Sequence, residues 1–208
     1  MPILTDIQLV SILELLGTIA FAISGIRLAS AKEFDWFGAI VVGYVTAVGG
    51  GTLRDLLLGV PPFWLQSSFY IWGTLFAFAI VVLFKKKLVH LNNTIFWFDC
   101  IGLGLFTVVG VEKALELNHT YWVCILMGTI TGAVGGIIRD TLINEIPVIF
   151  RQELYAVACI IGGLVYALFD YLTIDEKVTQ VTVFIVVVLV RVFATKFHWK
   201  LPTLRGEG

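Results

Sequence analysis

The sequence has little charge. Only 14% of its 208 residues are Asp, Glu, Lys or Arg, whereas 59% are hydrophobic, and the mean hydropathy is +0.96. A typical soluble domain has about 25% charged and about 45–50% apolar residues. The formal net charge of -1 gives no electrostatic reason to expect a nucleic acid or another polyanion as a partner. We therefore expect an integral membrane protein that does not bind nucleic acid.

Cysteine and histidine are also scarce. Cys100, Cys124 and Cys159 lie in apolar runs, and an odd number at such positions argues against a disulfide framework or a metal site. The three histidines fall at loops or segment ends, too scattered for a metal cluster or a catalytic triad. The glycine runs lack the Lys-Ser/Thr of a phosphate loop, and no serine sits in a nucleophile elbow. We expect no enzyme activity, no metal site and no cofactor.

We also expect no leader, linker or low-complexity tract. Its start has no basic region, Asp6 and Glu14 are acidic, and no small-residue cleavage pattern follows, so a removable signal peptide is not expected. The connections between apolar segments are short. We therefore predict one membrane domain over residues 1–208.

Long apolar runs, in contrast, are abundant. A spanning helix needs about 20 mostly apolar residues, and seven segments qualify. The fold class that follows is an all-α integral membrane protein with seven transmembrane helices. The predicted spans are Ile7–Leu28, Trp36–Leu58, Ser67–Phe84, Asn92–Val111, Tyr121–Ile143, Glu153–Tyr171 and Val178–Phe197.

Lysine and arginine are unequally shared between alternate connections. The side that holds the C-terminus collects most of them, whereas the other side has Lys113 and Lys177. The positive-inside rule then predicts an N-terminus outside the cell and a C-terminus in the cytoplasm. The residues of the basic side are Arg27, Lys32, Lys85, Lys86, Lys87, Arg151, Lys196, Lys200 and Arg205.

The sequence repeats itself at a constant offset, which equals the separation of Gly50 from Gly135. Fourteen positions between residues 14 and 70 are identical to their counterparts between 99 and 155, without a gap. This predicts two repeats of three helices, about 5–90 and 91–175, followed by a seventh helix at about 178–197. Because three is odd, the second repeat enters the membrane from the opposite face, which makes the repeat an inverted one with a pseudo-twofold axis in the membrane plane. The most distinctive matches are Gly50, Gly51, Arg54, Asp55 and Pro62 with Gly135, Gly136, Arg139, Asp140 and Pro147.

Ionisable residues within the predicted spans form two mirrored sets. Such residues usually face the interior of a bundle or a wet cavity. We expect Glu14 to pair with Arg54, and Asp99 with Arg139, in two charged vestibules. The alternative is that the arginines extend to lipid headgroups while the acids cap or brace helices. The full sets are Glu14, Arg54 and Asp55 towards the outer mouth, and Asp99, Arg139 and Asp140 towards the inner one.

Glycines interrupt the second and fifth predicted spans. Each costs about 1 kcal/mol of helix propensity relative to alanine, and a run of three does not keep to one helical face. We expect a kink or break at Gly49, Gly50 and Gly51, repeated at Gly135 and Gly136, that turns carbonyl oxygens into the bundle. Such carbonyls, with threonine hydroxyls, are hard oxygen ligands that suit K+ or Na+. The threonines are Thr46, Thr52 and Thr131.

These features resemble the prokaryotic members of the trimeric intracellular cation channel (TRIC) family, which are also grouped under a domain named for glycine transport. The resemblance rests on the seven spans and on GGGTLRD in the second span with GGIIRD in the fifth. It implies a homotrimer in which each protomer encloses a pore for K+ and other monovalent cations, gated near its kinked second and fifth helices. The basic lipid-binding region of animal members has no match here, so phosphoinositide dependence is not implied.

The sequence therefore predicts a K+ channel of a bacterial inner membrane. Membrane lipids are expected partners, and a specifically bound lipid is compatible with the prediction. The rival hypothesis is a secondary transporter for glycine or another small zwitterion, because inverted repeats with broken helices are equally a transporter architecture. A third is a structural or lipid-binding membrane protein without a pathway.

Overall fold

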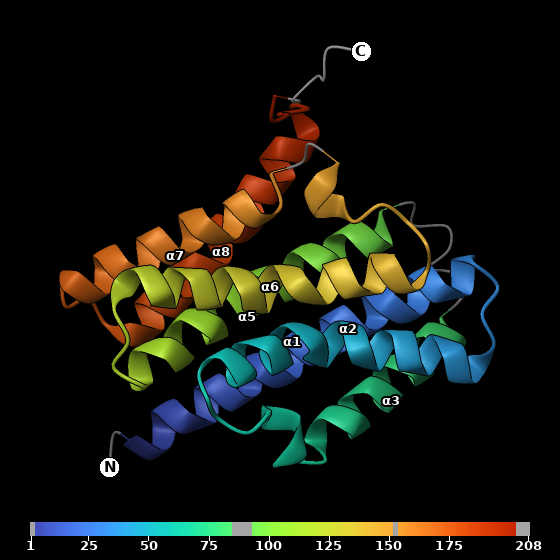
Figure 1. Cartoon of the computed structure of the whole chain (residues 1–208), viewed down its shortest axis with the longest axis horizontal. Coiled ribbons are helices and arrows are strands. Elements are labelled where there is room, and N and C mark those ends of the chain that lie inside the picture. The colour runs from blue at the N-terminus through green and yellow to red at the C-terminus, as the bar shows by residue number, and fades with distance from the viewer. Residues whose placement is uncertain (1–2, 85–92, 152–153, 203–208) are drawn as a thin grey trace.

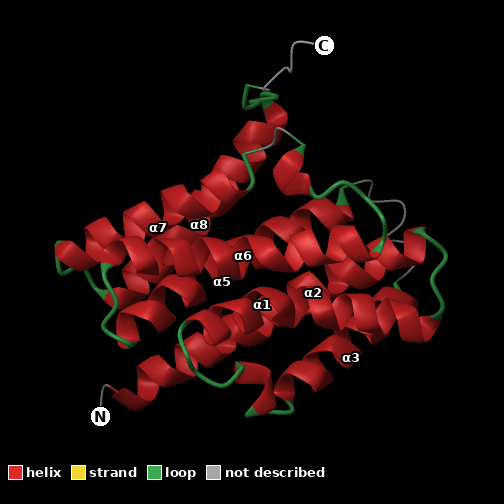
Figure 2. Ribbon diagram, in the orientation of Figure 1, coloured by secondary structure: helices red, strands yellow, loops and turns green. Residues whose placement is uncertain are grey.

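The computed structural model describes residues 3–84, 93–151 and 154–202. These residues form seven α-helices and two short 3-10 helices, and the part of the chain that is described contains no strand (Figure 2). The elements are α1 (Ile3–Ala31), α2 (Trp36–Leu57), η1 (Phe63–Leu65), α3 (Phe69–Leu83), α5 (Thr94–Glu116), α6 (Tyr121–Leu142), η2 (Val148–Phe150), α7 (Ala156–Tyr171) and α8 (Glu176–Lys196).

Five of these helices are long and apolar enough to cross a membrane: α1, α2, α5, α6 and α8. The other two, α3 and α7, have 15 and 16 residues, or roughly 22–24 Å at 1.5 Å per residue. Each follows a proline and a 3-10 turn, which use part of the apolar segment before the helix begins. All seven predicted segments contain a helix. The prediction was wrong about the end of α5, which continues past Val111 to Glu116 and includes the charged residue Glu112.

The central layer of the bundle consists of α1, α2, α5 and α6. These helices pack most extensively on one another, with α3 against α1 and α2 on one side and α7 and α8 against α5 and α6 on the other (Figure 1). Small residues allow these close approaches. For example, a Cβ added at Gly17 would lie 3.1 Å from the ring of Phe106, and one at Gly25 would meet Thr46 and the backbone of α2. The central layer also contains the glycine-rich segments of α2 and α6 and most of the buried ionisable residues.

Most of the described helices are followed by a residue with positive φ, two positions after the last helical residue. A hydrogen bond then runs back across the last turn, as from the Val60 N–H to the Asp55 carbonyl after α2 and from the Glu145 N–H to the Asp140 carbonyl after α6. This arrangement satisfies carbonyls that would otherwise lack a partner at the helix end. It produces the short connections expected of a compact bundle. The positive-φ residues are Glu33, Gly59, Asn118, Asn144, Thr173 and His198.

Candidate functional site

The glycine-rich segments lie within continuous helix. α2 is unbroken through Gly49, Gly50 and Gly51, and α6 is unbroken through Gly135 and Gly136. The helices are therefore not broken at these glycines, and α2 ends only at Leu57; a kink within the continuous helix stays a prediction. Side chains or backbone of neighbouring elements fill the space beside these glycines.

The three glycines of α2 face three different neighbours. A Cβ at Gly49 would lie 2.7 Å from Cδ1 of Ile138, one at Gly51 would lie 2.5 Å from the ring of Phe63, and one at Gly50 would collide with the Thr131 carbonyl oxygen. This explains why the run does not keep to one helical face. Close packing against neighbouring elements therefore accounts for these glycines.

The contact between α2 and α6 is reciprocal. A Cβ at Gly50 would collide with the carbonyl oxygen of Thr131, and a Cβ at Gly135 would collide with that of Thr46. Since Thr46 precedes Gly50 by one turn and Gly135 follows Thr131 by one turn, the two helices run antiparallel where they meet. We call this contact, formed by Thr46, Gly50, Thr131 and Gly135, the glycine seam.

The seam threonines are buried and hydrogen-bonded to their own helices. The hydroxyl of Thr46 donates to the Val42 carbonyl and that of Thr131 to the Met127 carbonyl, each at 2.6 Å. Thr52 lies further along α2, where it donates to the Val48 carbonyl and accepts from the indole of Trp64 at 2.9 Å. Thr46 and Thr131 therefore belong to the seam, while Thr52 ties α2 to η1.

One charged group lies near the N-terminal part of α1 and the C-terminal end of α2. Arg54 donates to Asp55 at 2.8 Å, and its Nη2 lies 3.8 Å from Glu14. Tyr70 of α3 donates to the other oxygen of Glu14 at 2.7 Å. We call Glu14, Arg54, Asp55 and Tyr70 the Glu14 cluster.

The second group is its counterpart in the other half of the chain. Arg139 donates to Asp99 at 2.6 Å and to Asp140 at 2.8 Å, and Tyr155 donates to Asp99 at 3.3 Å. We call Asp99, Arg139, Asp140 and Tyr155 the Asp99 cluster. Both ion pairs expected from the sequence are therefore present, and each cluster contains a tyrosine whose counterpart was among the repeat identities.

The aspartates beside the arginines brace the chain. Asp55 accepts from the Phe63 N–H at 2.8 Å, and Asp140 accepts from the Val148 N–H at 3.0 Å, so each carboxylate fixes the 3-10 helix that follows. The arginines do not extend to headgroups, because Arg54 and Arg139 are 1% and 2% exposed. The alternative interpretation was thus right about bracing by the acids and wrong about the arginines.

The two clusters differ in access. The Glu14 cluster lies in the wall of a cavity of about 830 Å³, which is also lined by Gln66, Ser67 and Lys113. In the Asp99 cluster every residue is buried, and Arg139 gains a third partner, the hydroxyl of Ser24, at 2.6 Å. In the Glu14 cluster, by comparison, Nη2 of Arg54 is buried and makes no hydrogen bond. The described structure therefore has one accessible and one closed charged group.

Several polar residues of this site and its surroundings were missed by sequence reasoning. Ser24 has Val109 as its repeat counterpart, so the repeat gave no signal for it. In α8, Gln180 and Arg191 are buried. The sequence did contain a signal for Arg191, because a charged residue within an apolar helix requires a polar or aromatic partner. In the structure its guanidinium lies over the rings of Tyr155 and Phe96.

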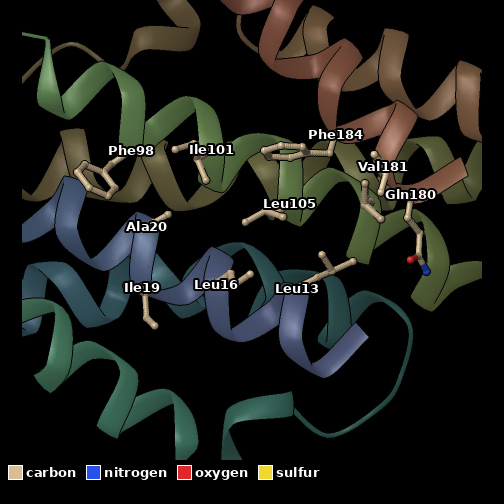
Figure 3. A pocket seen from close by; sticks show the side chains of 11 residues that line it. Leu13, Leu16, Ile19, Ala20, Phe98, Ile101, Leu105, Gln180, Val181 and Phe184 are labelled. Carbon is tan, nitrogen blue, oxygen red and sulfur yellow. The ribbon is translucent and has the colours of Figure 1, made fainter. Parts of the chain in front are cut away.

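A separate, apolar cavity of about 420 Å³ lies between α1, α5 and α8 (Figure 3). Its wall is formed by aliphatic and aromatic side chains such as Leu16, Leu105 and Phe184, with Gln180 at one end (Figure 3). Such a lining does not suit an inorganic ion, which needs oxygen ligands. The cavity of the Glu14 cluster, in contrast, is lined by ionisable side chains.

Comparison with known proteins places these features in a family. A family model described as Glycine transporter matches residues 11–86 and again residues 96–171, so the two matches are separated by the same offset as the internal repeat. The UPF0126 inner membrane protein YadS of Escherichia coli is 39% identical over 202 residues, covering 94% of this chain and 96% of that protein. A UPF0126 membrane protein of Vibrio cholerae is 39% identical over 203 residues, covering 95% and 84%.

Solved structures of TRIC proteins have the same fold as this chain. The TRIC orthologue from Rhodobacter sphaeroides superimposes with a TM-score of 0.87 at 33% identity, covering 91% of this chain and 98% of that one. The chain belongs to the bacterial TRIC family. A prokaryotic TRIC channel solved in 0.5 M KCl superimposes with a TM-score of 0.85 at 30% identity, covering 93% and 99%. This TRIC protein is therefore a helical membrane protein.

Proposed function

We propose that this TRIC protein is a channel for monovalent cations, with K+ as its physiological ion. The observation that carries the proposal is the pair of charged clusters, one at each end of the central layer, each formed by an acid, an arginine–aspartate pair and a tyrosine. Buried ionisable groups within a membrane bundle mark ion pathways. The likeness to solved TRIC cation channels at 30–34% identity supports the same activity.

We infer that the two halves form an inverted repeat. Phe21 and Phe106, which are counterparts in the repeat, contact each other with ring centroids 5.2 Å apart. A residue that touches its own counterpart lies near the symmetry axis, and the reciprocal Gly50–Thr131 and Gly135–Thr46 contacts favour the same position for the seam. The antiparallel course of α2 and α6 is the course that an inverted repeat requires.

The conduction path then runs from one cluster to the other within a single protomer. Its narrowest part lies at the glycine seam, where backbone touches backbone and leaves no room for an ion. Gating requires that α2 and α6 part at this seam, which adds Thr46 and Thr131 oxygens to the path. The accessible Glu14 cluster attracts cations to one mouth, and release of Arg139 from Ser24 and Asp99 opens the other.

The surroundings of the channel follow from its relatives and its charges. The name of the TRIC family supports a homotrimer, and a path between the two clusters of one chain gives each protomer its own pore. The E. coli relative is an inner membrane protein, and the distribution of Lys and Arg supports an external N-terminus and a cytoplasmic C-terminus in the same membrane. The apolar cavity between α1, α5 and α8 is suited to an acyl chain of a bound lipid.

Transport of glycine is the second candidate, because the matching family model carries that description. Recording from purified protein in a planar bilayer with asymmetric KCl distinguishes the two. Discrete current steps that reverse near the K+ potential are expected. Electrical silence, together with saturable glycine uptake into proteoliposomes, would replace the channel by the transporter.

A further inference from the structure

Two buried oxygen atoms without a donor lie where the end of α5 meets the start of α8. Glu112 is 4% exposed and its Oε2 makes no hydrogen bond, and Gln180 is 3% exposed and its Oε1 makes none. A buried carboxylate oxygen without a partner is costly in a fold whose other buried acids are paired. The missing partner is therefore either a proton shared with the neighbouring carboxyl group of Glu176 or a bound cation.

The amide of Gln180 bridges two carboxylates. Its Nε2 donates to Glu112 at 2.9 Å and to Glu176 at 3.3 Å, which brings together two acids from different helices, α5 and α8. A half-turn of the amide exchanges its nitrogen for its oxygen at the same place. The side chain can therefore bridge the acids when the site is empty and offer an oxygen ligand when a cation is present.

A small cavity is lined by the two acids but not by Gln180. Its volume is about 180 Å³, and its lining includes Glu112, Glu116, Asp170 and Glu176 but no Lys or Arg. Two of the acids have local partners, since Glu116 lies 3.4 Å from Lys113 and Asp170 accepts from the hydroxyl of Tyr121 at 2.8 Å. Of these two partners only Lys113 is a cation, so among the described residues the acids of the cavity without a cationic partner are Glu112, Asp170 and Glu176.

We propose that Glu112, Glu176 and Gln180 bind a hydrated divalent cation of the Mg2+ type. Mg2+ retains several waters and is usually held by one or two carboxylates, which matches two acids beside a cavity with room for several waters of about 30 Å³ each. Among the described residues, no three Asp, Glu, His or Cys side chains lie close enough together to bind one metal ion directly. The proposed ion therefore keeps most of its bound water. The site joins α5 to α8, and its three residues belong to neither charged cluster.

The test is a titration of purified protein with MgCl2 after treatment with a chelator, followed by thermal unfolding. Binding to the folded state raises the apparent Tm as the ion concentration exceeds its Kd. In Glu112→Gln and Glu176→Gln, the Mg2+ concentration that gives the half-maximal rise should increase about tenfold or more. Glu33→Gln, which removes an exposed carboxylate after α1, is the matched control and should titrate as wild type.

If Glu112→Gln fails to fold, Glu176→Gln still provides the test, because Glu176 is exposed and its replacement should not affect folding. The proposal is overturned if Mg2+ leaves the wild-type Tm unchanged, if both variants respond as wild type, or if KCl at equal ionic strength produces the same rise. Because unfolding is measured rather than current, the result does not depend on whether the protein conducts K+.

Discussion

Gly50 lies directly against the carbonyl oxygen of Thr131, with no space for even one methyl group between them. The same relationship recurs between Gly135 and Thr46, so the close approach of α2 and α6 depends on two glycines. A glycine inside a helix normally costs about 1 kcal/mol relative to alanine. Here that cost is accepted because backbone contact at the seam is possible only without a Cβ atom.

Replacing Gly50 by alanine should push α2 away from α6. Overpacking of a well-packed interior typically costs about 1–3 kcal/mol, and backbone cannot rotate away as a side chain can. Gly50→Ala and Gly135→Ala should therefore lower the apparent Tm, or hold the seam apart and raise the open probability. Gly49→Ala is the control, because its Cβ meets only the flexible end of Ile138. If both seam variants have wild-type stability and gating, the seam is not the constriction.

The two ion pairs should differ in strength. Asp99 and Arg139 are 2.6 Å apart, whereas Glu14 and Arg54 are 3.8 Å apart and more accessible. Removing one partner of a fully buried pair costs about 3–5 kcal/mol. Double-mutant cycles on unfolding should give a larger coupling energy for Asp99→Asn with Arg139→Gln than for Glu14→Gln with Arg54→Gln. Equal coupling energies would mean that the closed and accessible clusters are not distinct.

Ser24 should contribute to the closed state. Its hydroxyl accepts from Arg139 at 2.6 Å, and the Glu14 cluster has no equivalent because the counterpart of Ser24 is Val109. Ser24→Ala removes this acceptor at little cost in volume and should raise the open probability. Thr18→Ala, another buried hydroxyl of α1, should leave it unchanged. Identical gating in Ser24→Ala and wild type would exclude the Arg139 contact as a lock.

Glu145 gives a pH-dependent prediction outside the spanning helices. Hydrogen bonding and charge from Lys32, and then from Arg151, lower the pKa of Glu145 below its ordinary value. A lowered pKa stabilises the folded protein above the ordinary pKa of glutamate, and this contribution is lost as the pH falls through the lowered value. The stability difference between wild type and Glu145→Gln should be constant near neutral pH and shrink as the pH falls below the ordinary pKa of glutamate. A difference that grows on acidification would contradict the assignment. High salt should reduce it, because all three side chains are partly exposed.

The sequence predicted the helical segments and the main ion pairs well because both depend on simple patterns. Apolar length identifies spans, and the internal repeat indicated that Arg54 and Arg139 have equivalent partners. It misjudged the glycines because propensity counts only the cost within a helix, while the benefit comes from a neighbour in the other repeat. The contact of Ser24 with Arg139 was not predicted because the repeat counterpart of Ser24 is Val109, so the repeat gives no signal for it. Glu112 and Gln180 were missed because only the folded bundle brings their helices together.

The most direct test of the central claim, an ion path that begins at the Glu14 cluster, is chemical modification of Ser67 during single-channel recording. Ser67 lines the accessible cavity, and the native cysteines are buried, so Ser67→Cys supplies a reactive thiol where wild type has none. A positively charged thiol reagent applied from the side of the N-terminus should reduce the K+ current stepwise, while wild type stays unaffected. Complete modification of Ser67→Cys, confirmed by mass spectrometry, with an unchanged current would contradict the account.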